Sequence, residues 1–157
     1  RQGYPPSVFA ALPRLLERAG NAAQGSITAI YTVLVAGGDM EEPIADEVRG
    51  IVDGHIVLDR ELGARGRWPA VDVLHSVSRV MPSVASADHG GAARRVRELL
   101  ATYEQHRDLI TLGAYKAGSE PKVDDAMGRI GSIEKFLSQG IHESTGFEEI
   151  VARLAAI

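Results

Sequence analysis

The stretch that decides the fold class is Ser-Ile-Thr-Ala-Ile-Tyr-Thr-Val-Leu-Val-Ala at residues 26–36. It is rich in β-branched residues and almost continuously apolar, which is typical of a buried strand in a sheet covered on both faces. Gly-Gly-Asp at residues 37–39 ends it. Pro43 then favours a helix over residues 43–51, and a second short strand is predicted over residues 55–58. Strand, helix and strand in this order have βαβ spacing, which places the first half of the chain in the α/β class.

The remaining segments divide into an irregular stretch and a helical second half. Residues 7–19 have apolar side chains at helical spacing, but Pro13 lies inside the pattern and predicts a kink or a late start. Residues 68–82 carry a proline near each end and no clear period, which predicts an irregular segment. From residue 86 onward, three amphipathic stripes predict an all-helical unit. The stripes are Val96, Leu99, Leu100, Tyr103 and Ile110; Val123, Ile130, Ile133 and Leu137; and Phe147, Ile150, Val151 and Leu154.

The composition narrows the class of protein. The chain has 157 residues, a net charge of −4 and no cysteine, with 45% hydrophobic and 5% aromatic residues. The acidic balance argues against a nucleic-acid partner, and the lack of cysteine excludes a disulfide scaffold. No apolar run is long enough to span a bilayer. The sequence begins at Arg1 without a methionine or a signal-peptide pattern, so we expect it to be part of a longer protein.

Most active-site templates are absent from the sequence. The five histidines are scattered without ligand spacing, so no metal site is predicted. The G-x-S-x-G motif of serine hydrolases does not occur. The phosphate loop G-x-x-x-x-G-K-[ST] does not occur either, so these residues alone predict no cradle for a triphosphate.

Three charged clusters are predicted to be structural. Glu41-Glu42 and Asp124-Asp125 each lie at the start of a predicted helix, where complementarity to the helix dipole explains them better than acid–base chemistry. Arg94, Arg95 and Arg97 could bind a phosphate group. On an amphipathic helix of an acidic chain, a solvated face is the favoured interpretation.

Blocks spread over the whole chain resemble one family. They include Gly-Tyr-Pro-Pro-Ser-Val-Phe at residues 3–9, Asp-Gly-His-Ile-Val-Leu at 53–58 and Ser-Val-Ser-Arg-Val-Met at 76–81. The others lie at residues 12–20, 25–29, 43–46, 69–74, 100–104 and 110–115. In this order and spacing, the chain resembles the export ATPases of flagella and of type III secretion, and more distantly the catalytic subunits of rotary ATP synthases.

The resemblance implies an α/β fold of two parts. Residues 1–85 would be the C-terminal portion of a RecA-like P-loop NTPase domain, and residues 86–157 an all-helical C-terminal domain. It also implies that the phosphate loop, the Mg²⁺-binding aspartate and the catalytic glutamate lie upstream of Gly3. ATP and Mg²⁺ would then be bound mainly by that upstream half, and the isolated chain is predicted to be inactive.

The resemblance assigns roles to a few residues. Arg79 matches the arginine of the S-x-S-R block, which reaches across a subunit boundary to the γ-phosphate of the neighbour's ATP; the alternative is a structural arginine of its loop. Trp68 matches the aromatic residue that stacks on adenine; the alternative is a core anchor. Phe147, or alternatively Ile141, would be the second adenine-side residue, with core packing the other interpretation of Phe147. Asp59, followed by Arg-Glu-Leu, is more similar to flagellar members.

The implied function is ATP hydrolysis by a homohexamer that energises flagellar (type III) protein export. The implied partners are other copies of the chain, a coiled-coil stalk, regulatory export proteins and complexes of export substrates with chaperones. The implied location is the cytoplasm, peripheral to the export gate in the inner membrane. Two alternatives stay open: an injectisome type III secretion ATPase, and a non-catalytic nucleotide-binding or regulatory subunit of a rotary ATPase.

Overall fold

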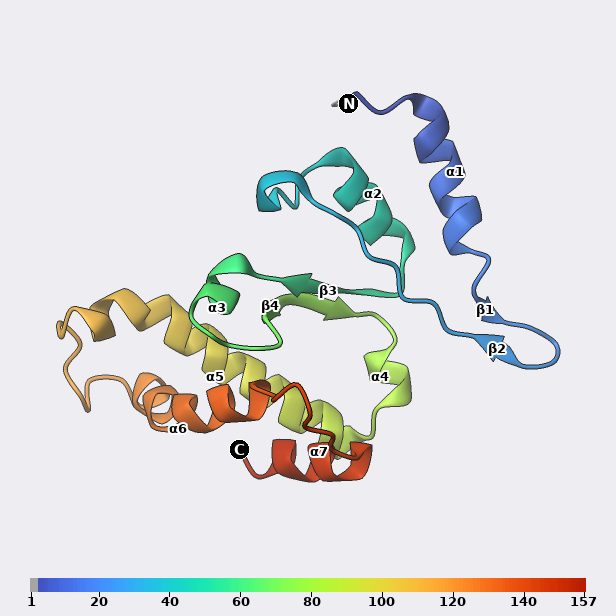
Figure 1. The fold of residues 1–157 in the computed structure, drawn as a ribbon. Helices are drawn as coiled ribbons and strands as arrows, with labels where there is room; N and C mark the ends of the chain where they lie inside the picture. The colour runs from blue at the N-terminus through green and yellow to red at the C-terminus, as the bar shows by residue number, and fades with distance from the viewer. Residues whose placement is uncertain (1–2) are drawn as a thin grey trace. The chain divides into compact units, whose positions relative to one another are not determined.

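The computed structural model describes residues 3–157, so Arg1 and Gln2, where the sequence begins without a methionine, lie outside the described residues. The chain divides into two compact units, one up to His55 and one from Ile56 onward. Figure 1 labels the helices and strands along the chain. Each unit is described by itself.

The first unit combines helices with a short hairpin. It contains α1 (Pro6–Leu16), the hairpin of β1 (Gly20–Asn21) and β2 (Ser26–Ile27), the short 3₁₀ helix η1 (Ala36–Gly38) and α2 (Pro43–Ile51). The two strands pair antiparallel, with Gly20 opposite Ile27. Helix α1 begins seven residues before Pro13 and runs through it, so the predicted late start is wrong. The predicted helix over residues 43–51 is confirmed, with Pro43 in its first turn.

The predicted buried strand over residues 26–36 is wrong beyond its first two residues. Only Ser26–Ile27 forms a strand, and Ile30 and Leu34 are more than nine-tenths exposed. A strand obtains its hydrogen bonds from a neighbouring strand, whereas a helix makes its own. Among residues 3–157, no strand pairs with residues 28–35, so this segment has no sheet in which to be buried and the βαβ unit does not form.

The second unit contains a two-stranded sheet and a helical bundle. Its elements are the end of β3 (Gly54–Leu58), α3 (Arg60–Ala64), β4 (Val71–Ser78), α4 (Met81–Val84), α5 (Ala87–Thr111), α6 (Pro121–Leu137) and α7 (Phe147–Ala155). Strands β3 and β4 pair with each other and run in opposite directions (Figure 1). The predicted strand over residues 55–58 is therefore confirmed.

The prediction of an irregular segment over residues 68–82 is wrong, because the segment contains the eight-residue strand β4 and the start of the short helix α4. The alternation of β4 is concealed by its polar residues. Asp72 turns its carboxylate back onto the strand, where Oδ1 accepts hydrogen bonds from the backbone N–H groups of Leu74 and His75 at 3.0 Å each. Pairing with β3, rather than a local period, stabilises this strand.

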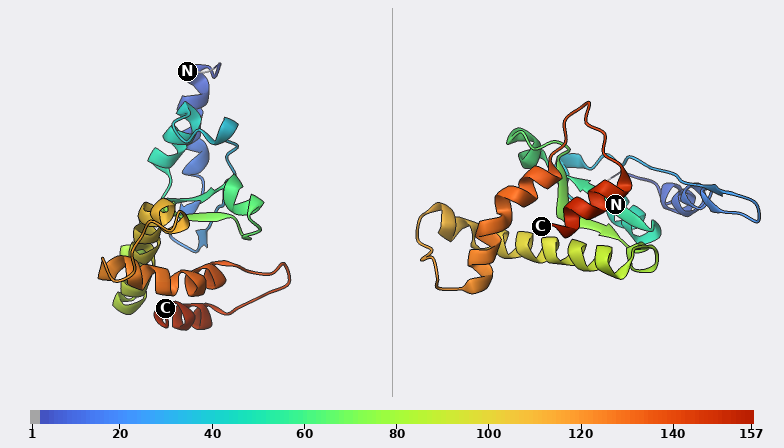
Figure 2. Two further views of the ribbon diagram at one scale, coloured as in Figure 1. Left: turned by 90° about the vertical axis from the view of Figure 1, so that its left-hand side faces the viewer. Right: turned by 90° about the horizontal axis from the view of Figure 1, so that it is seen from below.

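The core of the second unit lies between α5, α6 and α7, as the helical stripes predict. Helix α5 packs against both α6 and α7, and the views of Figure 2 show the three helices side by side. Buried residues of this cluster are Val96, Leu99, Leu100, Ala126, Ile133 and Leu154. Val73 and Leu74 of β4 pack against the same cluster, so the strand is anchored to the helices. Phe147 and Ile150 are exceptions to the predicted stripe, because they are 67% and 39% exposed.

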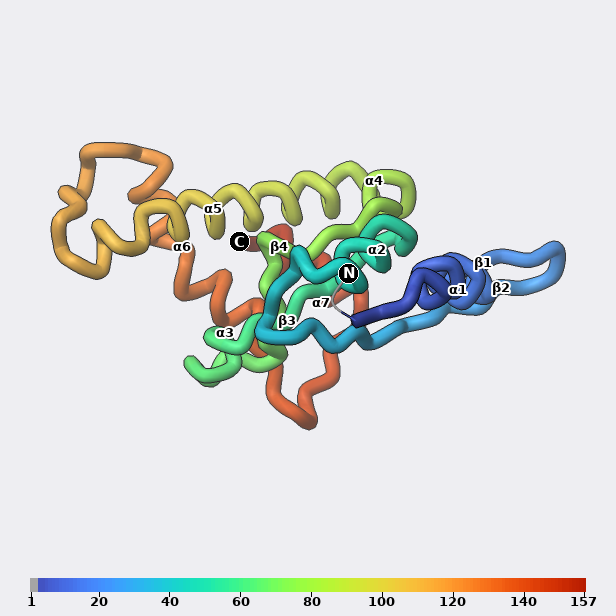
Figure 3. The backbone as a smooth tube through the Cα atoms, turned by 90° about the horizontal axis from the view of Figure 1, so that it is seen from above, coloured from blue at the N-terminus to red at the C-terminus, as the bar shows by residue number. Residues whose placement is uncertain are grey.

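Helix α5 is the longest element and begins nine residues before Val96, the first residue of the predicted stripe. The side chain of Ser86 caps it, since its Oγ accepts a hydrogen bond from the backbone N–H of His89 at 3.2 Å. Figure 3 follows α5 from α4 to the loop that leads into α6. Among the helices formed by residues 3–157, none combines the length and the apolar character needed to cross a bilayer.

Candidate functional site

Trp68 lies on a loop between α3 and β4 that is closed by its own hydrogen bonds. Asp59 caps α3, because its Oδ1 accepts from the N–H of Leu62 at 2.8 Å, and its own N–H donates to the carbonyl of Ala70 at 2.8 Å. Arg67 Nη2 donates to the carbonyl of Val71 at 2.5 Å and closes the loop on the other side of Trp68. The loop therefore presents the indole in a defined place, with 60% of the residue exposed.

The indole of Trp68 rests against α3 at a glycine. A methyl group built on Gly63 would lie 3.3 Å from Cη2 and 3.4 Å from Cζ2 of Trp68. Contacts this close leave no room for a side chain without displacement of the ring. Gly63 thus sets how near the indole can approach the helix.

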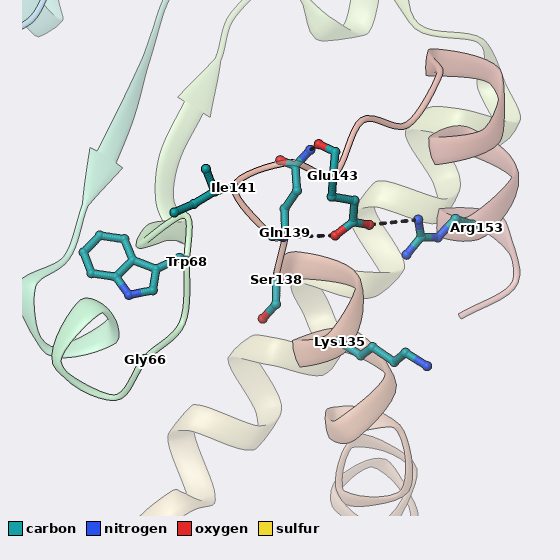
Figure 4. Close-up of a pocket in the computed structure, with 9 residues that line it drawn as sticks. Gly66, Trp68, Lys135, Ser138, Gln139, Ile141, Glu143 and Arg153 are labelled. Carbon is teal, nitrogen blue, oxygen red and sulfur yellow. Dashed lines mark hydrogen bonds and ion pairs between the residues drawn. The ribbon is translucent and has the colours of Figure 1, made fainter.

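An open cleft of about 680 Å³ lies beside Trp68 (Figure 4). Its volume is in the range of small-molecule sites. Its lining combines the apolar faces of Trp68 and Ile141 with the charged groups of Lys135, Glu143 and Arg153. Gly66, Ser138, Gln139 and Gly140 complete the lining. The cleft can therefore hold a flat aromatic group against the indole and polar groups further along.

The loop after α6 is tied to the Trp68 loop. The backbone N–H of Gln139 donates to the carbonyl of Trp68 at 2.7 Å. Glu143 folds the loop on itself, since its Oε2 accepts from the N–H of Gly140 at 3.0 Å and its Oε1 lies 3.8 Å from Arg153 Nη1. In Figure 4 the side chain of Ile141 points from this loop toward the indole.

The structure brings Ile141, and not Phe147, to the Trp68 cleft. Phe147 is the first residue of α7, and its ring meets the ring of His89 edge to face, with centroids 5.9 Å apart and an angle of 70°. Among the described residues, Phe147 does not line the cleft. The sequence left both residues as candidates because they are only six positions apart and no local period separates their roles.

Arg79 is exposed at the other end of β4, in the turn between the strand and α4. The two serines that precede it in the S-x-S-R block hold this turn. Ser76 Oγ accepts from the N–H of Val57 on β3 at 3.0 Å and donates to the carbonyl of Asp72 at 2.5 Å. Ser78 Oγ accepts from the N–H of Met81, the first residue of α4, at 3.2 Å and so closes the turn around Arg79. The block therefore combines two structural serines with one exposed cation.

Arg97 does not lie on the solvated face that was predicted for the cluster of Arg94, Arg95 and Arg97. Its guanidinium is half-buried and donates to the carbonyls of Val73, Leu74 and Ser76 on β4. Of its neighbours, Arg94 is exposed as predicted, and Arg95 forms a surface pair with Asp125 at 3.5 Å. The apolar stripe does not separate Arg97 from Arg95, because Arg95 also lies one turn before a buried leucine, Leu99.

The two acidic pairs are structural, as predicted. Glu42 is buried, and its Oε2 accepts from the backbone N–H of Ala36 at 3.1 Å. The carboxylate of Asp124 accepts hydrogen bonds from the N–H of Gly118 at 2.9 Å and from the hydroxyl of Tyr115 at 3.1 Å. These bonds hold the loop between α5 and α6. Among residues 3–157, no three histidine, aspartate or glutamate side chains come together as a metal site.

The surroundings of Asp72 shift the pKa of its carboxyl group. Its partial burial would raise the pKa of the carboxyl group, but the backbone N–H and the ring of His75 outweigh this and hold the pKa below its ordinary value. His75 Nδ1 lies 2.7 Å from Asp72 Oδ2, and the N–H of Leu74 adds a further hydrogen bond. The charged carboxylate is therefore part of the folded structure of β4.

Two family models match consecutive parts of the chain. Residues 1–78 match the ATP synthase alpha/beta family, nucleotide-binding domain, and residues 85–156 match the T3SS EscN ATPase C-terminal domain. The chain is 54% identical over 99% of its length to the flagellum-specific ATP synthase of Bacillus subtilis, and 54% identical over its full length to the type 3 secretion system ATPase of Sinorhizobium fredii. The chain belongs to the flagellar and type III secretion ATPases.

Solved structures of this family confirm the fold class. The assembled ATPase EscN of the type III secretion system of enteropathogenic E. coli is 46% identical and superposes with a TM-score of 0.93, over 97% of this chain and 37% of that one. EscN in complex with its central stalk EscO gives a TM-score of 0.86 at the same identity, over 97% of this chain and 36% of that one. The chain spans 36% of the Bacillus relative and 35% of the Sinorhizobium relative.

The domain boundary predicted at residue 85 stays a prediction. The two family models meet between residues 78 and 85, whereas the two compact units meet between His55 and Ile56. The two boundaries differ because the first follows sequence similarity and the second follows contacts within this chain.

Proposed function

We propose that this chain is the C-terminal part of an ATPase that hydrolyses ATP as a homohexameric ring and energises type III protein export, in its flagellar form. Support comes from similarity to export ATPases over nearly the whole chain. The flagellar assignment rests on Asp59-Arg60-Glu61-Leu62, because flagellar and secretion relatives reach the same identity of 54%. The injectisome ATPase is the second candidate for that reason.

The observation that carries the proposal is the separation of Trp68 from Arg79. Trp68 precedes β4 and Arg79 follows it, and eight extended residues span roughly 25 Å. A nucleotide whose adenine lies against Trp68 cannot place its γ-phosphate beside Arg79 of the same chain. The two residues therefore serve different nucleotides, as they would in a ring whose sites lie between subunits.

Each residue has a chemical role in this arrangement. The indole of Trp68 offers a flat apolar face to adenine, and Ile141 covers the same cleft from the loop after α6. Arg79 provides a permanently charged, planar fork that neutralises the charge developing on the γ-phosphate of the neighbour's ATP. Upstream residues would hold the phosphates and Mg²⁺ and orient the attacking water.

Partners and location follow from the same proposal. EscN is solved with a central stalk, so the helical part of this chain, from α5 onward, would contact a coiled-coil stalk protein. Regulatory export proteins and complexes of export substrates with chaperones would bind the ring, which would lie in the cytoplasm against the membrane-embedded export gate. The isolated chain of residues 1–157 has no phosphate loop and would not hydrolyse ATP.

The experiment compares Arg79→Ala with Arg94→Ala in the full-length protein. Loss of an arginine finger costs about 10³-fold or more in turnover, so Arg79→Ala is expected to form rings that hydrolyse ATP at least that much more slowly. Arg94 is an exposed arginine on α5 and its variant should match the wild type. Rings of Arg79→Ala with full turnover would refute the role of Arg79. A wild-type ring without turnover would favour the non-catalytic rotary subunit.

A further inference from the structure

Arg97 binds three carbonyl groups on one strand. Its Nη1 donates to the carbonyls of Val73 at 2.6 Å and Ser76 at 3.1 Å, and its Nη2 donates to that of Leu74 at 3.1 Å. The planar guanidinium directs its donors in fixed directions, so these bonds fix β4 both along and across its length. The contact joins residues more than 20 positions apart, from the middle of α5 to the central part of β4.

The held part of β4 continues directly into the turn that carries Arg79. Ser76, whose carbonyl Arg97 binds, lies three residues before Arg79 and is also tied to β3 through Val57. After Arg79, the N–H of Met81 donates back to Ser78 Oγ at 3.2 Å, and the carbonyl of Val80 accepts from Ser83 Oγ at 2.7 Å. With both sides of the turn held, the backbone of Arg79 has little freedom of its own. Its position follows that of β4.

Stability alone does not explain an arginine at this place. The hydrogen bonds of Arg97 among the described residues go to carbonyl groups, and no carboxylate lies within ion-pair distance of it. A half-buried charge without a counter-charge gains little over an apolar residue of similar volume, which would pack beside Val73 and Leu74. What the guanidinium adds is a directional link between a helix of the core and the strand that leads to Arg79.

We propose that Arg97 is a positioning residue for ATP hydrolysis in the neighbouring subunit. Through β4 it determines the position of Arg79, so that a movement of the α5–α7 bundle is transmitted to the nucleotide site of the neighbouring subunit. This inference rests on the proposed role of Arg79. Helix α5 suits the task because Val96 and Leu100, on either side of Arg97, are buried in the same core as α6 and α7.

The first measurement separates positioning from nucleotide affinity. In the full-length protein, Arg97→Leu is expected to lower kcat by about 10²-fold, because small displacements of a catalytic group have effects of this size, while KM for ATP stays unchanged. Arg97→Lys should fall between this variant and the wild type, since an ammonium group can reach a carbonyl but lacks the planar fork. Arg94→Leu, an exposed arginine on the same helix, is the matched control and should behave as wild type.

The second measurement tests whether the defect acts in trans. Arg97→Leu subunits are mixed with subunits whose upstream phosphate-loop lysine is replaced by alanine. In a mixed ring, some sites combine the intact phosphate loop of an Arg97→Leu subunit with the correctly positioned Arg79 of a lysine-variant subunit. Turnover should return at these sites. The same rescue is expected when Arg79→Ala subunits are mixed in place of Arg97→Leu subunits. A defect in the fold or in the subunit's own nucleotide site would not be complemented in this way.

The outcomes separate the two proposals. Full turnover by Arg79→Ala rings refutes the proposed function and this inference together. If Arg79→Ala rings are slow but Arg97→Leu rings turn over at the wild-type rate, only the role of Arg97 is refuted. The same conclusion follows if Arg97→Leu rings are slow and mixing does not rescue them. If Arg97→Leu fails to assemble, Arg97→Lys decides: reduced kcat, unchanged KM and rescue on mixing support the inference, and wild-type kcat overturns it.

Discussion

Trp68 and Arg79 lie just beyond the two ends of strand β4. One is a half-exposed indole on a cleft, and the other is an exposed cation in a turn held by serines. The strand between them packs on the helical core and is bound by Arg97, so both of its ends are attached to the same core. In a ring, such a strand would link the adenine side of one site to the phosphate side of the next.

Gly63→Ala is expected to displace the indole of Trp68. The added methyl would lie 3.3 Å from Cη2, so the ring must shift, and KM for ATP in the full-length protein should rise several-fold while kcat changes little. Trp68 is the only tryptophan in residues 1–157, so a change in its emission spectrum in the isolated chain reports the shift directly. Gly128→Ala is the control, because a methyl there meets nothing within 4 Å and should leave the emission unchanged.

Ile141→Ala should weaken nucleotide binding more than Phe147→Ala does. Ile141 lines the Trp68 cleft, whereas the ring of Phe147 lies against His89. Removal of an apolar contact of this size costs about 1–3 kcal/mol of binding, or roughly tenfold or more in KM for ATP. Steady-state kinetics of the two full-length variants provides the comparison. If KM rises more for Phe147→Ala than for Ile141→Ala, then Phe147 and not Ile141 provides the second contact with adenine.

The stability of the isolated chain should fall in acid partly through Asp72. Its pKa is below the ordinary 3.8 in the folded state because the hydrogen bonds from His75 outweigh the effect of burial. A carboxyl group with a lowered pKa stabilises the fold at pH values above its unfolded pKa, and this contribution is lost as the pH falls through the folded pKa. Urea midpoints between pH 6 and pH 3, measured for wild type and Asp72→Asn, should therefore converge as the pH falls. Parallel curves would contradict the assignment.

Ser76→Ala and Ser78→Ala should differ in what they destabilise. Ser76→Ala leaves the N–H of Val57 without its hydroxyl acceptor between β3 and β4, which costs about 1–3 kcal/mol of unfolding free energy. Ser78→Ala removes an exposed acceptor for the N–H of Met81, the first residue of α4, which costs about 0.5–1.5 kcal/mol. Urea denaturation of the isolated chain measures both costs. Ser119→Ala, in the exposed loop before α6, provides a reference for a serine outside β4.

Local sequence was sufficient for the helices of the second half. The stripes through Val96 and Leu100, through Val123 and Ile133, and to Leu154 predicted which faces are buried. Helical hydrogen bonds run between residues four apart, so the period of apolar residues specifies both the element and its inner face. Pro43 specified the start of α2 for the same local reason. The family blocks singled out Trp68 and Arg79 without any structure.

Tertiary structure decided the features that depend on distant partners. Residues 28–35 have strand-like composition but no neighbouring strand among the described residues, while segment 71–78, which mixes polar and apolar residues, is a strand because β3 pairs with it. Arg97 became a link to β4 because α5 places it within reach of carbonyls more than 20 residues away. Ile141 lines the Trp68 cleft because the N–H of Gln139, two residues before it, donates to the carbonyl of Trp68. Each of these depends on a bond between segments far apart in the chain, and no periodicity within one segment encodes such a bond.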